Sequence, residues 1–457
     1  MIERMALRFT RFAEQFLPDA FVFALLATVI VFVAGIGVGA SPFELTSAWG
    51  DGFWELIGFT MQMALVIITG YVVASARPVH RYLIESIARA AVARSARTQV
   101  AMVALFAMAS SWLNWGFSLI FSAMLVREIA RRRGSADYRA MGAASLLGLG
   151  SVWAQGLSGS AALQMATKGA LPDRVREIVS VNGGIIDFSH TIFLWQSGLS
   201  VVIEIAVVTL IMWLAAPTGE KARTAESLQI EIPDAQEILE RPTTWGERFE
   251  HSPILIWLMC ALGAIYLAHT FRGGLSSLTL NSINMTLLIL GMLLHRTPAR
   301  LMRAVREATP ATWGVILQFP FYAGIARMIA TTRLNERIAH VFVGISTQKT
   351  FPALMAAYSA LLGVFVPSGG SKWIIEAPYV MRAAHELKVH LGWVVACYDL
   401  GEAAANLVQP FWMLPVLALL GLRARDVMGY TFLVFLVLFP LVLVLTTVLG
   451  ATLAYPL

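Results

Sequence analysis

A single lysine stands among glycines and small hydroxyl residues inside an otherwise apolar stretch, residues 350–381. The interruption follows Pro367 and consists of Ser368, Gly369, Gly370, Ser371 and Lys372. At membrane depth, unpaired backbone groups are tolerated only where protein or a water-filled cavity satisfies them, and a lysine costs roughly 2.5–3.5 kcal/mol on insertion scales. The segment therefore predicts a site for a small anion. Lys372 could neutralise a substrate carboxylate, or it could pair with Glu376 one turn further on.

Three other apolar runs are interrupted by polar residues in the same way. The residues concerned are Asn114, Gly116 and Ser118 in the first run, Ser158, Gly159 and Ser160 in the second, and Asp399, Glu402, Asn406 and Pro410 in the third. A broken helix exposes N–H groups that suit a carboxylate and carbonyl groups that suit a cation. We therefore expect the four breaks to converge on one substrate site, although helix–helix packing is the alternative for any single serine or glycine.

Two carboxylates in the last run are candidates for ion coupling. Asp399 and Glu402 are one turn apart on a predicted helix and share a face. They could bind a proton or a sodium ion near the hairpin tips, or they could form a structural pair with a buried basic group. Asn182, Asp187 and His190 could line a cavity or could be solvated at a loop edge. No cofactor is expected apart from a coupling ion.

The composition indicates a polytopic helical membrane protein. Of the 457 residues, 58% are hydrophobic and 14% are charged, against about 25% charged residues in a typical soluble protein. Arginines at the ends of apolar runs act as topology determinants, so the pI of about 9.5 does not indicate a nucleic-acid partner. The glycine-rich runs match neither a P-loop nor a nucleophile elbow. We expect a transporter rather than an enzyme, and one that is not driven by ATP through this chain alone.

The distribution of charge predicts the topology. Arg4, Arg8 and Arg11 precede the first apolar run, whereas the loop 41–55 carries acidic residues only, so the N-terminus is expected in the cytoplasm. Both ends of the segment 98–126 are basic. A straight helix of that length would measure about 43 Å, against a hydrocarbon core of roughly 30 Å. A re-entrant hairpin folded at Asn114 fits better than a long tilted helix.

The chain also contains a weak internal repeat. A shift of 256 residues places Gly58 on Gly314 and Gln62 on Gln318, and the order of spans and interruptions recurs. An extra connecting span makes the number of intervening crossings odd, so the second copy would be inverted. Two unrelated halves that share only apolar periodicity are the alternative. The predicted organisation is a first repeat at 1–216 with a hairpin at 98–126 and a broken helix at 138–168, a cytoplasmic linker at 217–250, a connecting span at 251–272, and a second repeat at 273–457 with a hairpin at 350–381 and a broken helix at 390–422. The expected fold class is thus an all-α polytopic membrane protein with two inverted repeats, re-entrant helical hairpins and broken transmembrane helices.

Three motifs carry a resemblance to a known family. They are Val-Pro-Ser-Gly-Gly-Ser-Lys-Trp-Ile-Ile-Glu-Ala-Pro at 366–378, Ser-Trp-Leu-Asn-Trp-Gly at 111–116, and Gly-Leu-Ser-Gly-Ser at 156–160. With them the chain resembles, over nearly its full length, the bacterial short-chain fatty acid transporter family of the acetoacetate and butyrate type. That family is similar to the wider ion-transporter superfamily that includes dicarboxylate and aminobenzoyl-glutamate carriers.

The resemblance implies a scaffold domain, a moving transport domain with two hairpins, and a homodimer in the bacterial inner membrane. Together with the four breaks, it predicts a secondary transporter of small monocarboxylates that is ion-coupled and elevator-like. An anion channel and an exporter of another small organic anion are the alternatives.

Overall fold

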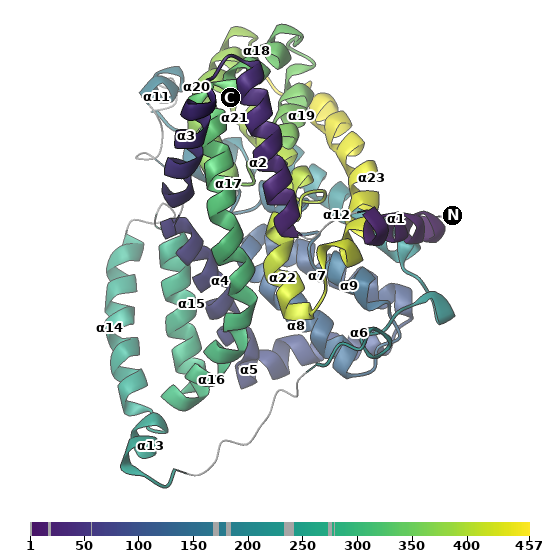
Figure 1. Cartoon of the computed structure of the whole chain (residues 1–457), viewed down its shortest axis with the longest axis vertical. Coiled ribbons are helices and arrows are strands. Elements are labelled where there is room, and N and C mark those ends of the chain that lie inside the picture. The colour runs from purple at the N-terminus through teal and green to yellow at the C-terminus, as the bar shows by residue number, and fades with distance from the viewer. Residues whose placement is uncertain are drawn as a thin grey trace.

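The computed structural model describes residues 2–16, 20–55, 57–167, 173–179, 184–232, 242–272, 277 and 279–457. The described chain is helical and contains no β-strand (Figure 1). Five of its helices are long and apolar enough to cross a membrane, or six if the bent pair formed by the first two helices counts as one span. These spans and the interrupted apolar segments between them make the chain a multi-pass membrane protein.

The helices follow one another in a recurring order, which is clearest when each half is given separately. The first half contains α1 (Ile2–Phe16), α2 (Ala20–Gly37), α3 (Pro42–Glu55), α4 (Ile57–Ser75), α5 (Arg77–Val79), the π-helical turn η1 (His80–Ile84), α6 (Glu85–Val92), α7 (Ala96–Leu113), α8 (Trp115–Arg131), α9 (Tyr138–Ala144), the 3-10 turn η2 (Val152–Gln155), α10 (Ser160–Met165), α11 (Asp173–Ile178), η4 (Phe188–His190) and α12 (Trp195–Ala215). The linker contains η5 (Gly219–Lys221), η6 (Glu226–Leu228) and α13 (Trp245–Glu250). The second half contains α14 (Ile254–Thr270), α15 (Leu280–His295), α16 (Pro298–Ala308), η8 (Thr309–Thr312), α17 (Trp313–Thr331), α18 (Leu334–Gly344), α19 (Phe351–Gly363), α20 (Gly369–Glu386), α21 (Leu391–Ala405), η9 (Phe411–Met413), α22 (Leu414–Leu420) and α23 (Ala424–Gly450).

Two long helical segments show that the halves are related by inversion. The segments Pro42–Ser75 and Pro298–Thr331 are both 34 residues long, and their ends coincide under the shift of 256 residues found in the sequence. Tyr71, late in the first segment, donates a hydrogen bond to Glu307, early in the second, at 3.1 Å. Gly52, early in the first, lies against the carbonyl of Ala323, late in the second. The equivalent helices therefore run in opposite directions, as inverted repeats require.

Each predicted hairpin interval contains two consecutive helices joined by a short turn. Helix α7 ends where Asn114 adopts an extended backbone, and the Asn114 side chain accepts a hydrogen bond from the Phe117 N–H at 2.9 Å, which caps α8. The Ser118 hydroxyl donates to the carbonyl of Ala107 at 2.6 Å and ties the two arms together. The second pair, α19 and α20, turns at residues 364–368. The two pairs extend over residues 96–131 and 351–386 and so contain nearly all of the predicted intervals, 98–126 and 350–381.

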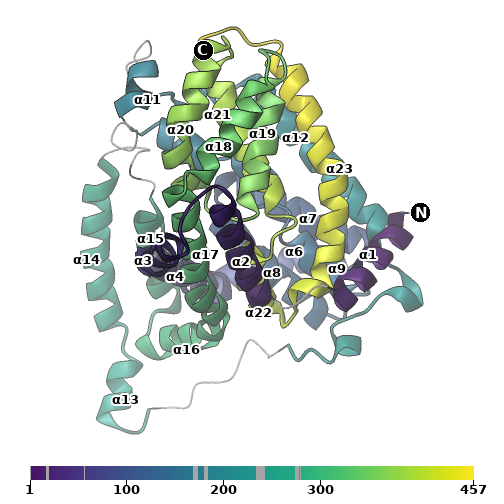
Figure 2. The same cartoon turned by 45° about the horizontal axis from the view of Figure 1, so that its top comes forward.

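Both broken helices occur inside the predicted intervals. The first interval, 138–168, contains α9, η2 and α10, and the second, 390–422, contains α21, η9 and α22. The pair α7 and α8 packs on α9, and α19 and α20 pack on α21. Each hairpin therefore covers the broken helix of its own half. Figure 2 shows α2, α3 and α17 grouped beside the α19–α21 bundle.

Some segments differ from the sequence-based expectation. Of the span expected at 178–216, the described residues 184–194 form a loop with the short turn η4, and the long helix begins at Trp195. An N-terminal helix, α1, was not expected, and it packs its buried face of Ala6, Thr10 and Ala13 against α23. Residues 233–241 of the predicted linker lie outside the described part, as do 273–276 after the connecting span. The exact domain boundaries stay a prediction.

Candidate functional site

The broken segment 156–160 lies against the tip of the first hairpin. The Leu157 N–H donates to the carbonyl of Trp112 at 2.8 Å, and the Trp115 N–H donates to the Ser158 hydroxyl at 3.1 Å. Gly156 is required here, because a β-carbon at that position would lie 2.2 Å from the Trp112 carbonyl oxygen. The first two of the four predicted breaks are therefore joined directly.

The same segment reaches the tip of the second hairpin on its other side. Gln164 donates from its side-chain amide to the carbonyl of Gly370 at 2.9 Å. A β-carbon on Gly369 would lie 3.2 Å from the β-carbon of Ser160, so Gly369 lies close to the Ser160 side chain. Glycine at position 369 thus permits the close approach of the first broken helix to the tip of the second hairpin.

Asp399 joins the fourth break to the second. Its side chain is fully buried, and its carboxylate accepts hydrogen bonds from the Ala161 N–H at 3.0 Å and from the Ala162 N–H at 3.2 Å. These donors lie in the first turn of α10, where a negative charge is favoured. The N-terminus of α10 is consequently occupied by a carboxylate of the protein itself.

Lys372 forms an ion pair with Glu402 rather than with Glu376. Its ammonium group contacts the Glu402 carboxylate and donates to the carbonyl of Ser359 at 2.8 Å. It also lies 5.1 Å from the ring centre of Tyr398, and only 2% of the Lys372 side chain is exposed. Glu376 instead accepts a hydrogen bond from the Tyr398 hydroxyl. In this conformation the lysine is therefore one member of a buried ion pair.

Lys372, Glu376, Asp399 and Glu402 form a group that we call the Lys372 cluster, and its buried charges do not balance. Lys372 is accompanied by three buried carboxylates, those of Glu376, Asp399 and Glu402. Buried ions need a partner of opposite charge, or they become neutral by taking up or losing a proton. Among the described residues, no three His, Cys, Asp or Glu side chains are grouped as metal ligands. The excess of carboxylates is nevertheless suited to binding protons or a monovalent cation.

The other predicted site residues divide into a partly accessible set and a buried set. Those at the surface of the convergence point, at least partly accessible, are Asn114, Ser158, Ser160, Ser368 and Gly370. Those fully enclosed are Gly116, Ser118, Gly159, Gly369 and Asn406. Asn406 donates to the carbonyl of Leu149 at 3.2 Å and links the two broken helices. The side chain of Ser371 lies outside the described residues.

Asp187 and His190 lie apart from the convergence point. Asp187 caps η4 by accepting from the Ser189 N–H at 2.8 Å, and the hydrogen bond from the Ser189 side chain lowers the pKa of Asp187. The His190 carbonyl packs against Gly392 in the first turn of α21, two turns before Asp399. Asn182 lies outside the described residues.

Two contacts of the site were not anticipated from the sequence. Ser359 and Tyr398 surround the Lys372 ammonium group, and Glu204 in α12 binds Gln155 at the edge of the second break. Glu204 could have been singled out from the sequence, because it is the only charged residue in the apolar helix Trp195–Ala215. The partners of Lys372 carry no comparable local signal.

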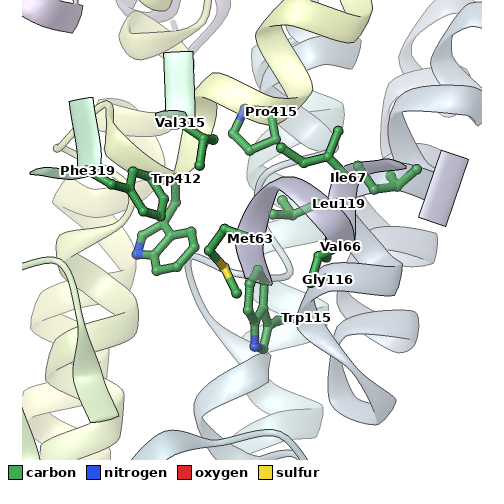
Figure 3. Close-up of a pocket in the computed structure, with 11 residues that line it drawn as sticks. Met63, Val66, Ile67, Trp115, Gly116, Leu119, Val315, Phe319, Trp412 and Pro415 are labelled. Carbon is green, nitrogen blue, oxygen red and sulfur yellow. The ribbon is translucent and has the colours of Figure 1, made fainter. Parts of the chain in front are cut away.

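An apolar pocket adjoins the first hairpin tip (Figure 3). Met63, Val66 and Ile67 of α4 line one side, and Trp115 at the start of α8 lines another, with Trp412 of η9 beside it. The ring centres of Trp115 and Trp412 are 5.0 Å apart. The pocket thus lies where the long inverted helices meet the hairpins and broken helices.

Inverted repeats whose hairpins and broken helices meet inside the membrane define a secondary-transporter class of protein. The sequence profile of the family described as "Short chain fatty acid transporter" matches residues 1–449. The chain therefore belongs to the short-chain fatty acid transporter family, whose members are transporters and not enzymes.

Individual relatives agree in extent with that match. A protein of Escherichia coli (strain K12) is 37% identical over 94% of this chain and 96% of its own length, and one of Haemophilus influenzae is 35% identical over the same shares. Both names assign those proteins, provisionally, to short-chain fatty acid transport. The YdaH transporter of Alcanivorax borkumensis covers 95% of this chain and 98% of its own at 15% identity and a TM-score of 0.45. MtrF of Neisseria gonorrhoeae covers 95% and 97% at 13% identity and a TM-score of 0.41.

Proposed function

We propose that the protein is an ion-coupled secondary transporter that takes up short-chain monocarboxylates such as acetoacetate and butyrate across the bacterial inner membrane. The observation that carries the proposal is the convergence of the four helix breaks, which are held together by the bonds from Trp115 to Ser158, from Gln164 to Gly370 and from Ala161 to Asp399. A site assembled from both repeats can be exposed to either side of the membrane in turn. Family membership supports the class of substrate.

The substrate carboxylate is proposed to bind at the N-terminus of α20. Helix N-termini attract anions through free N–H groups and the helix dipole. The corresponding end of α10 already holds Asp399, which leaves the N–H groups around Gly369 and Gly370 as the available counterpart. Asn114, Ser158, Ser160 and Ser368 would provide further polar contacts at this position.

Lys372 and Glu402 are proposed to link ion binding to substrate binding. Their ion pair lies one turn from Gly369, where an added β-carbon would approach the Glu402 side chain to 3.2 Å. A proton or sodium ion on Glu402 would weaken its attraction for Lys372, which could then face a substrate carboxylate. Asp399 would be a second group that senses the bound ion. Under this scheme, an anion and a cation enter the buried site together, which avoids an isolated buried charge.

An elevator-like motion is proposed for the hairpins and broken helices. They meet the long helices α4 and α17 through the apolar pocket surface of Met63, Val66, Val315 and Phe319 (Figure 3). Apolar contacts are not directional, so such an interface can slide with little loss of specific bonds. The long inverted helices would then form the scaffold. A homodimer with a cytoplasmic N-terminus completes the proposal.

The proposal is tested with purified protein in proteoliposomes. Uptake of labelled acetoacetate and butyrate is measured with sodium and pH gradients imposed separately, together with counterflow at equal ion concentrations. We expect saturable uptake and counterflow, which a channel does not show. Absence of both for every C2–C6 acid would reject the proposed function, and single-channel currents would favour an anion channel instead. Light scattering of the detergent-solubilised protein would test the homodimer.

A further inference from the structure

Glu204 is a buried carboxylate in the middle of an apolar membrane span. It is the tenth residue of the 21-residue helix α12, and its side chain is fully buried. One carboxylate oxygen accepts from the Gln155 amide at 2.6 Å and from the Ser200 hydroxyl at 2.9 Å. The other oxygen, Oε2, is buried without a hydrogen-bond partner, and so is the amide oxygen of Gln155. Two unpartnered polar atoms therefore lie together at this position.

No cation in the described part of the chain compensates Glu204. The elements packed on α12 are α1, α7, α23 and η2, and α21 approaches it through Trp393 and Cys397. The titratable or charged groups on these elements are Glu3, Arg4, Arg8, Arg11 and Glu14 on α1, Arg97 on α7, Arg425, Asp426 and Tyr430 on α23, none on η2, and Cys397, Tyr398, Asp399 and Glu402 on α21. None of them forms an ion pair with Glu204 among the described residues.

The helix packing explains why these groups are remote. Arg97 pairs with Glu3 and lies 5.4 Å from the ring of Trp213, more than two turns beyond Glu204 along α12. Gln196 bonds Thr452 at 2.9 Å, so the end of α23 lies beside the start of α12 and the two helices are antiparallel. The part of α23 that lies opposite Glu204 is therefore the apolar run that precedes Thr446. A carboxylate in such surroundings must carry a proton to remain buried.

Gln155 connects this carboxyl group to the first hairpin. It is the last residue of η2, and the two residues that follow Gly156 make the hydrogen bonds that hold the hairpin tip, from Leu157 to Trp112 and from Trp115 to Ser158. An amide has both a donor and an acceptor. Gln155 can therefore donate to an ionised Glu204 or, with its amide turned over, accept from a protonated one. Each protonation state of Glu204 favours one orientation of Gln155.

We propose that Glu204, with Gln155 and Ser200, is a proton-binding site separate from the Lys372 cluster, and that its proton is linked to the closure of the first hairpin. This proposal rests on the proposed transport function, and it adds a transported proton to that function. The proton is taken from water when the hairpin opens the site to one side, and it is released to water on the other. No covalent bond other than the O–H bond of the carboxyl group is formed or broken in this cycle.

The first test is infrared spectroscopy of the purified full-length protein in lipid nanodiscs at neutral pH. We expect the carbonyl stretching band of a protonated carboxylic acid in the wild type, and we expect E204Q to lack that part of the band. Q155A removes the hydrogen-bond partner and should shift the same band while leaving its carboxyl group in place. A band that neither variant changes would overturn the proposal, and if E204Q does not fold, Q155A alone decides the assignment.

The second test is the number of protons moved with each substrate molecule, measured from reversal of flux in proteoliposomes with opposed pH and butyrate gradients. E204Q should retain counterflow and lower the ratio of protons to substrate by one. An unchanged ratio would overturn the proposal while the transport function stands, as would wild-type uptake that depends on sodium alone. Wild-type protein without uptake or counterflow would instead reject the proposed function, whatever the infrared result.

Discussion

Lys372 and Glu402 form a buried ion pair that joins the second hairpin to the second broken helix. They are separated by 30 residues in the chain, and 2% and 1% of their side chains are exposed. Removing one partner of such a pair leaves an uncompensated charge in the interior, whereas removing both can be nearly neutral. The pair therefore offers a way to separate a structural role of Lys372 from a role in binding substrate.

Lys372→Met is expected to lower the free energy of unfolding by about 3–5 kcal/mol, because Glu402 is left buried and unpaired. The double variant Lys372→Met with Glu402→Gln should recover much of that loss. Thermal unfolding in nanodiscs measures both effects. If the double variant folds and binds butyrate with wild-type affinity, Lys372 has no direct part in substrate binding.

Asp399→Asn is expected to weaken the contact with α10. The carboxylate accepts hydrogen bonds from two N–H groups of that helix, and hydrogen bonds to a charged group contribute about 1.5–3 kcal/mol each. The uncharged amide of asparagine has one acceptor oxygen, so it replaces only part of the stabilisation that these two hydrogen bonds provide. Uptake under separate sodium and pH gradients should show an altered ion dependence if Asp399 senses the coupling ion. Asp187→Asn, at an exposed cap, is the matched control, and an identical response of both variants would exclude a coupling role for Asp399.

Ser158→Ala is expected to loosen the tip of the first hairpin, because the Trp115 N–H loses its acceptor. The expected effect on local stability is about 0.5–1.5 kcal/mol, seen as faster hydrogen exchange in residues near 112–117. Ser110→Ala serves as the control, since the Ser110 hydroxyl bonds only carbonyls of its own helix, those of Phe106 and Ala107. Equal exchange in the two variants would mean that the Ser158 bond does not hold the hairpin.

The repeated order of helices was predictable because its signals are local. Proline and glycine disfavour the interior of a helix, so the polar interruptions near Asn114, Gly156 and Pro367 mark the breaks without knowledge of the fold. Single residues are a weaker signal, because Pro320, Pro378 and Pro440 lie inside helices. The expectation failed between residues 184 and 194, where apolar residues fill a loop with one short turn rather than a continuous helix. Apolar composition alone does not distinguish a buried loop from a span. Helix α1 was missed because its polar face and short apolar face do not resemble a span.

The contacts within the site were only partly predictable. The four breaks could be grouped because each carries its own polar residues, but the choice of Glu402 rather than Glu376 as the partner of Lys372 depends on how α20 and α21 pack. Register between helices distant in sequence is set by close fits such as Gly401 against the carbonyl of Ala356, where a β-carbon would lie 2.0 Å from the oxygen. Each such fit depends on the surfaces of two helices that are distant from each other in the chain. The sequence of one segment does not contain them.

Gly401→Ala tests that close fit. Because the added methyl group has no space against the Ala356 backbone, α19 and α21 must separate, and overpacking of this kind typically destabilises by about 1–3 kcal/mol or more. Gly198→Ala is the control, since a β-carbon at Gly198 meets nothing within 4 Å and alanine favours a helix. The temperature of thermal unfolding should fall for the first variant and stay level or rise for the second. An unchanged Gly401→Ala protein would show that these helices can move apart freely.

A cross-link between Val66 and Gly116 tests whether the hairpins move relative to the long helices. A β-carbon on Gly116 would lie 2.8 Å from a side-chain carbon of Val66, so cysteines at both positions are close enough for a disulfide. With the native Cys260 and Cys397 replaced by alanine, oxidation of the pair should abolish uptake and reduction should restore it. The control pair replaces Val72 and Gly291, which are equally close but both belong to the long-helix region, in α4 and α15. Cross-linking that control should leave uptake unchanged. If the Val66–Gly116 cross-link forms fully and uptake continues, α4 and α8 do not slide past each other during transport, and the alternating exposure must come from a hairpin opening in place.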